Sequence, residues 1–383
     1  MSLLAATFLA AVLGAPADPP APIDEKLTAL VHKLGDRSYR VREAAARDLL
    51  RLGSAAVSAL GNGMADADPE VSERCRQLMP MAASIDRNEK LATLLKDPAA
   101  PPPKGLAGLD RFLKVTGDDK AARELYAEML GIHYRAIEAA DKDPKDGGRE
   151  LKDFCEEAYS RWQSEVRNGR YSYDNIFATR ADVSLFFFLA SDTRIARDSA
   201  ALNRASVLLY STRINKSLTG TEASPAVRKL FLEWLTNEPL PHMQQRGFQI
   251  AAQAGMKEAL PVAIKILQKK DQQPYNAAQA MTSLVRLGDK DTVKILVPYM
   301  ADKSNVGSVN FGNGPMHTIQ LRDVAMGVAV QLSGQKPAEF GFDTRNGGIA
   351  TGSSYIYYGF PDDKSRDEAH QKWKDFAVKN AKK

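Results

Sequence analysis

The sequence predicts an all-α protein in which short amphipathic helices stack as pairs into a superhelix. Apolar residues recur at spacings of three and four in one segment after another, which is the period of a helix with one buried face. Several of these helices end at a glycine and are followed at once by another helix, as at Gly53 and Gly288. Two blocks of helix pairs, a helical middle region without a clear repeat and a loop-rich C-terminal cap make up the predicted architecture.

Residues 1–17 have the pattern of a signal peptide. Leu3–Leu13 is an apolar run too short to span a bilayer, and Ala15–Ala17 offers a small-x-small cleavage pattern. The usual basic start is missing, since the first Lys or Arg is Lys26. We expect a secreted or periplasmic protein whose mature chain begins at Asp18. The alternatives are a misassigned start codon, or a cytoplasmic protein that begins with an ordinary apolar helix.

The composition is that of an ordinary globular protein. The chain has 383 residues, of which 44% are hydrophobic and 26% charged, and no later apolar run approaches membrane length. The net charge of +5 is small, and basic residues mostly alternate with acidic ones, so no dense basic block indicates nucleic-acid binding. Cys75 and Cys155 each lie on a predicted apolar helix face. We expect buried free thiols, and a disulfide between them is the alternative in an exported protein.

The first block of helix pairs is predicted over residues 23–95. In Gly35–Leu60, one helix carries its apolar residues on a single stripe, and Gly53 suits a left-handed turn into the next helix. A second unit starts at Pro69, because proline is favoured in the first turn of a helix. Pro80 is expected to stop or kink that helix, which interrupts the array.

The middle region is predicted to be helical without a clear repeat. It covers residues 105–238 and follows an extended linker, 96–104, that holds four prolines. The helices expected here cover residues 118–139, 151–166, 196–210 and 224–235, with a turn over 141–148 and a buried apolar helix at 185–190. The concentration of aromatic residues favours a large helical core. An apolar ligand pocket between helices is the alternative.

The repeat returns in residues 239–340, where two helix pairs turn at Gly255 and Gly288. These glycines lie 33 residues apart, within the period of about 20–50 residues that is typical of repeat architectures. The helices expected in this block cover residues 248–255, 260–267, 277–287, 293–300 and 321–332, and the second helix of each pair, 260–267 and 293–300, has an unbroken apolar stripe.

The C-terminal part, residues 341–383, is unlike a repeat. Two segments, Ser304–Met316 within the second block and residues 345–360, are glycine-rich and long for loops between helices. The second of them is expected either to form a small hairpin around Asn346-Gly347 or to lie over the core. Asp363–Lys379 is predicted as a final helix that shields the last repeat from water.

The repeat segments resemble HEAT-repeat proteins, the armadillo-like α-α superhelix group. The matching stretches are VREAAARDLLRLGSAAVSAL, RGFQIAAQAGMKEALPVAIKIL and NAAQAMTSLVRLGDKDTVKILVPYM, with a weaker match in LRDVAMGVAVQLSG. With its signal-like start, the chain is similar to exported bacterial HEAT-repeat proteins. The resemblance implies a superhelix of helix pairs and no particular activity, and it does not extend to residues 105–235 or to the tail.

Sequence patterns of catalysis and metal binding are absent from the chain. The histidines are scattered, with no HExxH, paired-His or Cys-x-x-Cys spacing, and neither GxSxG nor a phosphate-binding glycine loop occurs. Glu156 and Glu157 are adjacent, so they point in different directions from a helix and do not pair for acid–base work. We therefore expect no catalytic residue, no cofactor and no metal ion. The histidines considered are His32, His133, His242, His317 and His370.

The expected function is that of a non-enzymatic scaffold that holds a protein or peptide on the concave face lined by the second helices. The exposed residues expected on or near that face give it a mildly basic character, and they are Lys265, Gln268, Lys269 and Lys294. An enzyme built on helical repeats, as repeat folds related to lyases and DNA glycosylases occasionally are, is an alternative that needs a perturbed carboxylate or a nucleophile in a cleft. Nucleic-acid binding is the other alternative, for a chain that is not exported.

Overall fold

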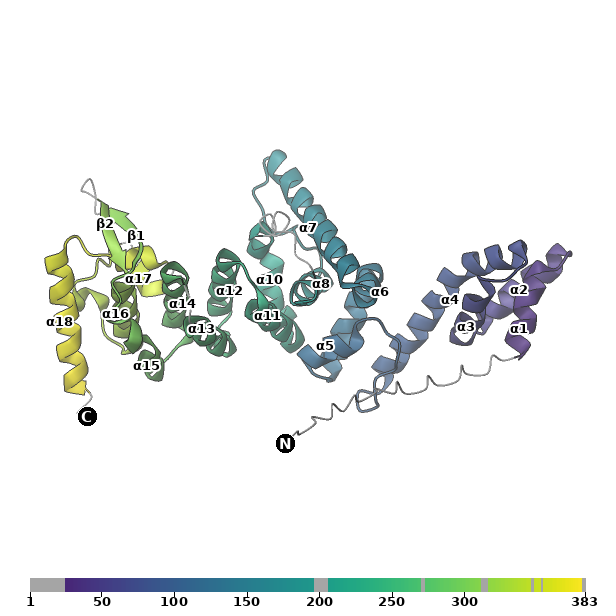
Figure 1. Cartoon of the computed structure of the whole chain (residues 1–383), viewed down its shortest axis with the longest axis horizontal. Helices are drawn as coiled ribbons and strands as arrows, with labels where there is room; N and C mark the ends of the chain where they lie inside the picture. Colours follow the sequence, from purple (N-terminus) through teal and green to yellow (C-terminus); the bar gives the residue numbers. More distant parts are fainter. Residues whose placement is uncertain are drawn as a thin grey trace, which may run out of the picture. The chain divides into compact units, whose positions relative to one another are not determined.

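The protein is mostly helical, which confirms the predicted all-α fold (Figure 1). The chain divides into two compact units, residues 1–106 and 107–383. The predicted signal peptide and most of the helix predicted over 196–210 lie outside the described residues. No helix among the residues described is both long and apolar enough to cross a membrane. The computed structural model describes residues 25–195, 206–269, 273–310, 316–345, 348–352 and 354–380.

Unit 1 has a small core formed by short helices and the first half of a long one. Its elements are α1 (Glu25–His32), η1 (Lys33–Gly35), α2 (Tyr39–Arg51), α3 (Ser54–Gly63) and α4 (Pro69–Lys96). Gly53 links α2 to α3 with a φ of +54°, a conformation that side chains other than glycine rarely adopt. A Cβ at Gly63 would lie 2.6 Å from Cys75 Sγ, so α3 and α4 approach each other as closely as a glycine allows.

Pro80 does not end α4, which continues to Lys96, so the stop predicted at this proline is wrong. Proline removes one helical hydrogen bond, but Pro80 is exposed, and on the solvent side of a helix water can satisfy a freed carbonyl. Leu78 and Ala82, on either side of it, are buried in the core of unit 1 and hold the helix in place.

Both cysteines are buried free thiols, as predicted, and the alternative disulfide does not form. Cys75 lies in the core of unit 1, whereas Cys155 lies in unit 2 on α7 (Pro144–Arg167). Burial raises the pKa of both thiols, that of Cys155 to about 12, so neither is a reactive thiolate near neutral pH.

Unit 2 begins with helices that pack around one wholly buried helix, α8. Its residues Ala181–Ala190 are all buried, which confirms the buried run predicted at 185–190. Phe187 packs edge-on against Phe231, with ring centroids 5.3 Å apart, and lies 5.2 Å from the Trp234 ring. The elements of this region, besides α7, are α5 (Leu109–Thr116), α6 (Lys120–Lys142), α8 (Arg180–Ala190), η2 (Ser206–Tyr210), α10 (Thr212–Leu218), η3 (Gly220–Glu222) and α11 (Pro225–Asn237).

The turn predicted over residues 141–148 is reduced to one residue, Asp143. Helix α6 runs to Lys142 and α7 starts at Pro144, so the two glycines of the predicted turn lie inside the first turns of α7. The Asp143 carboxylate accepts a hydrogen bond from the backbone N–H of Lys145 and caps α7. This cap and the proline in the first turn together start a helix where the glycines alone would not.

Helix α6 is broken at His133, whose φ of −117° and ψ of 27° are not helical. His133 Nε2 lies 2.8 Å from Asp182 Oδ1, and Asp182 Oδ2 accepts hydrogen bonds from the backbone N–H groups of Ala178 and Thr179. Burial of Asp182 opposes its ionisation, but the hydrogen bonds from His133 and from the backbone outweigh it and lower the pKa of this carboxyl. The pair thus fastens the break in α6 to the start of α8.

An Asp182→Asn variant tests whether the charge at this position stabilises unit 2. Because the folded pKa of Asp182 is below its unfolded value, the ionised form stabilises the fold above the unfolded pKa, and this contribution is lost as pH falls through the folded pKa. We expect the substitution to lower the free energy of unfolding by about 3 kcal/mol at pH 7. The deficit should shrink as pH falls below 3.8, the ordinary pKa of an aspartate.

Urea unfolding followed by tryptophan fluorescence measures this effect in unit 2 alone, because all three tryptophans, Trp162, Trp234 and Trp373, belong to it. Asp153→Asn, on the exposed side of α7, is the matched control and should leave stability unchanged. A deficit in the Asp182 variant that stayed constant across this pH range would rule out the role of the charge.

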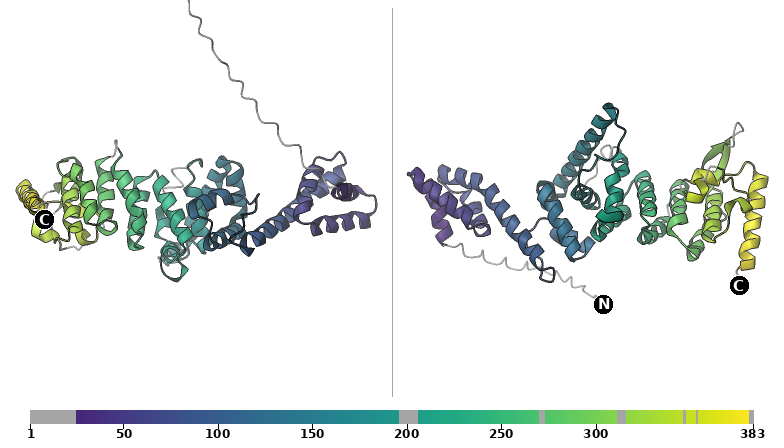
Figure 2. Two further views of the ribbon diagram at one scale, coloured as in Figure 1. Left: turned by 90° about the horizontal axis from the view of Figure 1, so that it is seen from below. Right: turned by 180° about the vertical axis from the view of Figure 1, so that it is seen from behind.

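The C-terminal repeats of unit 2 form a row of helices in which α12, α14 and α16 are neighbours (Figures 1 and 2). The stripe predicted over 293–300 is wrong in part, because the α-helix ends at Leu296 and Val297 is 60% exposed. Pro298 has no backbone N–H with which to continue the helix. The elements are α12 (Pro241–Gln253), η4 (Lys257–Ala259), α13 (Leu260–Leu267), α14 (Pro274–Leu287), η5 (Lys290–Thr292), α15 (Val293–Leu296), η6 (Val297–Tyr299) and α16 (Leu321–Leu332).

The segment predicted as a long loop, Ser304–Met316, instead contributes to an antiparallel hairpin. Strand β1 (Asn305–Asn310) pairs with β2 (Met316–Gln320), and Val309 lies opposite His317. Val306 and Ile319 are its buried residues, and they anchor the hairpin on the core. The two strands are short, and glycine and asparagine interrupt their apolar residues. The sequence therefore shows no clear alternation of apolar and polar residues that would predict a strand.

The tail lies over the repeats, which is the second of the two arrangements expected for residues 345–360. Asn346-Gly347, the centre of the alternative hairpin, lies outside the described residues. Helix α18 is held on α16 by the buried Asp323 carboxylate, since Arg366 Nε lies 3.0 Å from one of its oxygens and His370 Nε2 lies 3.1 Å from the other. The tail elements are η7 (Pro337–Phe340), α17 (Gly348–Thr351), η8 (Tyr355–Tyr358) and α18 (Asp363–Asn380).

Candidate functional site

The residues predicted to bind a partner lie on the second helices and are exposed. Lys265 is in α13, Gln268 and Lys269 directly follow it, and Lys294 is in α15. Lys294 Nζ lies 3.0 Å from Asp291 Oδ1, in a pair whose two side chains are more than 80% exposed. Such exposed pairs contribute little to stability and leave the lysine accessible. A binding role for these residues remains a prediction.

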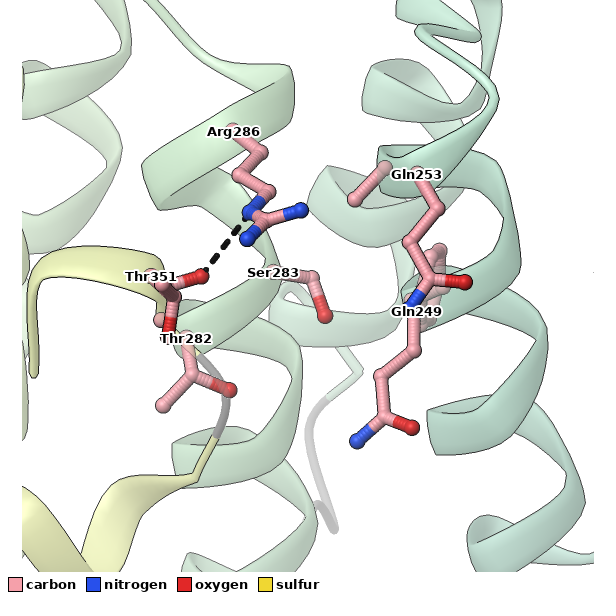
Figure 3. Close-up of a pocket in the computed structure, with 9 residues that line it drawn as sticks. Gln249, Gln253, Thr282, Ser283, Arg286 and Thr351 are labelled. Carbon is pink, nitrogen blue, oxygen red and sulfur yellow. Dashed lines mark hydrogen bonds between the residues drawn. The ribbon is translucent and has the colours of Figure 1, made fainter. Parts of the chain in front are cut away.

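A groove with a defined lining lies instead between the first helices α12 and α14 (Figure 3). We call it the α12–α14 groove, and its cavity volume is about 160 Å³. One side comes from α12, the other from α14, and the end of α17 closes it beside α14. The lining residues are Phe248, Gln249, Ala252, Gln253, Thr282, Ser283, Arg286, Thr351 and Gly352.

Helical periodicity places the polar lining in two facing rows. Gln249 and Gln253 are four residues apart on α12, and Ser283 and Arg286 are three apart on α14, so each pair shares a helix face. Figure 3 shows the glutamines and Ser283 on facing helices, with Arg286 extended toward Gln253. On the opposite side of α12, Gly247 lies close against Leu235 and Trp234 of α11, which seats the helix.

Helix α14 carries polar residues at buried positions. Gln279, Thr282 and Ser283 are each less than 10% exposed, in a helix whose other buried residues are alanine, methionine and leucine. The Thr282 and Ser283 hydroxyls donate to the Gln279 carbonyl, at 2.8 and 3.3 Å. Gln279 Oε1 is buried and has no hydrogen-bond partner in the described part of the chain. An unmade hydrogen bond of this kind costs about 1–3 kcal/mol, so stability does not explain why the Gln279 side chain is buried.

Arg286 ties the tail to the groove and also presents free hydrogen-bond donors. Its Nε donates to the Thr351 carbonyl oxygen at 3.0 Å, which holds α17 against α14. Its two terminal nitrogens have no partner among the residues described. Lys257 Nζ donates to the Arg286 and Leu287 carbonyls at the end of the same helix, 2.7 and 3.2 Å away. None of the lining residues that the structure describes is acidic, so together these residues carry positive charge.

Helix α12 joins the groove to a column of stacked aromatic rings. Arg246, three residues before Gln249 on the same face, donates to Gln249 Oε1 at 3.3 Å, and its guanidinium carbon lies 4.0 Å from the centre of the Tyr210 ring. Tyr210 packs on Tyr173 at 5.6 Å, and Tyr173 stacks on Trp162 at 6.1 Å. Burial lowers the pKa of Arg246, although the neighbouring tyrosines oppose this.

The lining residues that the structure describes carry amides, hydroxyls and a guanidinium, all of which can form hydrogen bonds with a ligand. Among the described residues, no group of three or more His, Cys, Asp or Glu side chains could hold a metal ion.

A wider hollow around His133, of about 420 Å³, is lined by Glu150, Asp153 and Glu157. Two of its ionisable side chains already have partners, because His133 pairs with Asp182 and Glu157 Oε1 lies 3.0 Å from Arg161. This hollow is therefore a weaker candidate for a binding site than the α12–α14 groove.

Comparison with known proteins adds little to this site. No protein-family model matches the chain, and no curated protein matches it. Among solved structures, the chain is similar to the crystal structure of an engineered protein from the Northeast Structural Genomics Consortium, at 14% identity over 93% of this chain and 99% of that one. The TM-score of that match is 0.24, too low to support an argument about fold or function.

Sequence reasoning missed the groove. The polar residues Gln279, Thr282 and Ser283 were the available signal, since they recur at spacings of three and four beside an apolar stripe. That pattern is also typical of a helix face exposed to solvent. Only the structure shows that the tail covers α14, so that these residues are buried.

Gly352→Ala tests whether the tail forms one wall of the groove. Gly352 has a φ of +59°, and a Cβ there would lie 2.4 Å from the Thr282 carbonyl oxygen. Alanine must therefore push α17 away from α14. We expect hydrogen exchange of residues 348–352 to rise about tenfold, because the segment loses its contacts and opens more often.

Gly255→Ala is the matched control, since Gly255 has a φ of +63° but nothing within 4 Å of the added Cβ. It carries the same backbone strain, a cost of about 1 kcal/mol, without the collision. Equal exchange of residues 348–352 in the two variants would show that α17 does not depend on its contact with α14.

Proposed function

We propose that this chain is a non-enzymatic binding scaffold of the HEAT-repeat type, and that its α12–α14 groove seats an extended peptide segment of a protein partner. The observation that carries the proposal is that Thr282 and Ser283, buried polar residues of α14, line the groove opposite the glutamines of α12. An amide both donates and accepts hydrogen bonds, as the backbone of an extended segment requires. A stack of helices offers such a surface without further elements.

The size of the groove supports a peptide over a cofactor. Pockets for drug-sized ligands measure about 300–1,000 Å³. The groove holds about 160 Å³, which suits one or two side chains, and α12 continues beyond it with Arg246 on the same face. A segment that places a side chain in the groove can therefore run along α12 toward Tyr210.

We place this scaffold outside the cytoplasm, on the strength of the signal-like pattern in residues 1–17. The exposed lysines of α13 and α15 are a competing surface in the same unit. A single binding assay separates the two surfaces, because α13 contributes no residue to the groove lining.

Selection from a random twelve-residue peptide library on the full chain provides ligands for this assay, with affinity measured by fluorescence anisotropy. We expect Gln253→Trp to weaken the selected peptides at least about tenfold, because an indole at this exposed position occupies the groove, and a factor of ten corresponds to about 1.4 kcal/mol. Circular dichroism confirms that the variant is folded.

The matched control is the double variant Lys265→Glu and Lys269→Glu on the competing surface, which should bind the same peptides unchanged. Failure to enrich any peptide would contradict the proposal. So would binding that survives Gln253→Trp and is lost in the double lysine variant, since that result would move the site to the second helices.

A further inference from the structure

The charged side chains described along the groove and the adjoining face of α12 are basic. Arg286 and Arg246 lie toward opposite ends of this surface, and both lack partners for some of their nitrogens within the described residues. Three carboxylates near them in the sequence have other partners. Glu238 Oε1 accepts a hydrogen bond from the Leu240 backbone N–H, Glu258 Oε1 lies 2.8 Å from Arg228 Nη2, and Asp289 accepts hydrogen bonds from the backbone and hydroxyl of Thr292.

The two guanidinium groups are spaced for an extended chain. Arg246 lies seven residues before Gln253 on α12, which is about 10 Å at 1.5 Å per residue. Arg286 reaches across from α14 toward Gln253 (Figure 3). A peptide in the polyproline II conformation rises about 3.1 Å per residue with three residues per turn, so this distance corresponds to about three residues and places side chains three positions apart on the same side. Gln249 lies between the two positions, and its Oε1 accepts a hydrogen bond from Arg246.

We propose that the groove selects a peptide segment with two acidic residues three positions apart, one paired with Arg286 and the other with Arg246. This inference rests on the proposed function. Guanidinium groups match carboxylates with paired hydrogen bonds, which are stronger than those between neutral groups. The Tyr210 ring beneath Arg246 fixes its guanidinium in place, so less side-chain freedom is lost when a carboxylate binds.

An acidic peptide fits this surface better than a nucleic acid. A nucleic-acid strand carries one charge about every 3.4 Å and is bound by runs of basic side chains. Here Arg246 and Gln253, toward which Arg286 reaches, are about 10 Å apart along α12, and the polar residues on this face are glutamines.

The sequences of peptides selected on the full chain test the inference directly. We expect Asp or Glu to be enriched at two positions three residues apart. Repeating the selection on Arg286→Glu should replace one of these acids by Lys or Arg and keep the other. A peptide from the first selection should bind the variant at least about tenfold more weakly, and a peptide from the second should bind it more tightly than it binds the unaltered chain.

Lys294→Glu is the control, because it changes the net charge by the same amount at an exposed position outside the groove. Equal weakening by this variant would overturn the inference in favour of long-range electrostatics. Selected peptides that lack the acidic pair, yet lose binding in Gln253→Trp, would refute the inference and leave the proposed function standing. The absence of any selected peptide would refute both.

A mixed-sequence single-stranded oligonucleotide serves as a competitor in the same assay. It should not displace the selected peptide at equal concentration. Displacement from the unaltered chain, together with loss of oligonucleotide binding in Arg286→Glu, would assign the groove to nucleic acid and overturn the inference.

Discussion

The enclosure of α14 is the constraint on which the C-terminal part of unit 2 depends. Helices α12, α13 and α16 contact it, as do the tail elements α17 and η8. Three alanines, Ala277, Ala278 and Ala280, are buried along it and allow the neighbouring helices to approach closely. A helix enclosed in this way can be apolar throughout, so its buried polar residues need a separate explanation. For Thr282 and Ser283, which line the groove, we propose that this explanation is the binding of a partner.

The tail forms one wall of the α12–α14 groove and also packs on α16. Arg286 donates to the Thr351 carbonyl, and Tyr358 is buried with its hydroxyl 3.0 Å from Gln331 Nε2. Burial raises the pKa of Tyr358, so this residue acts as a neutral hydrogen-bonding group. These two bonds connect the tail to α14 and α16 separately. The position of one groove wall therefore depends on residues more than sixty positions away in the sequence.

Local patterns predicted most of the helices but little of the site. The spacing of Val41, Ala45 and Leu49, or the run at 185–190, reports which face of a helix is buried, because that information lies within a few residues. The helix end predicted at Pro80 was wrong because the cost of a proline in a helix depends on whether it faces solvent. The neighbouring residues in the sequence do not determine this. The groove could not be predicted for a similar reason. One of its walls forms only because Gly352 lies against Thr282, which is far from it in the sequence.

The most direct test of binding in the groove is hydrogen exchange of the full chain with and without a selected peptide. We expect protection on binding to be concentrated in residues 246–253 of α12, 279–287 of α14 and 348–352 of the tail, because the peptide covers these backbone segments or holds them together. Protection confined to α13 and α15, with the groove segments unchanged, would contradict binding in the groove and would place the partner on the second helices.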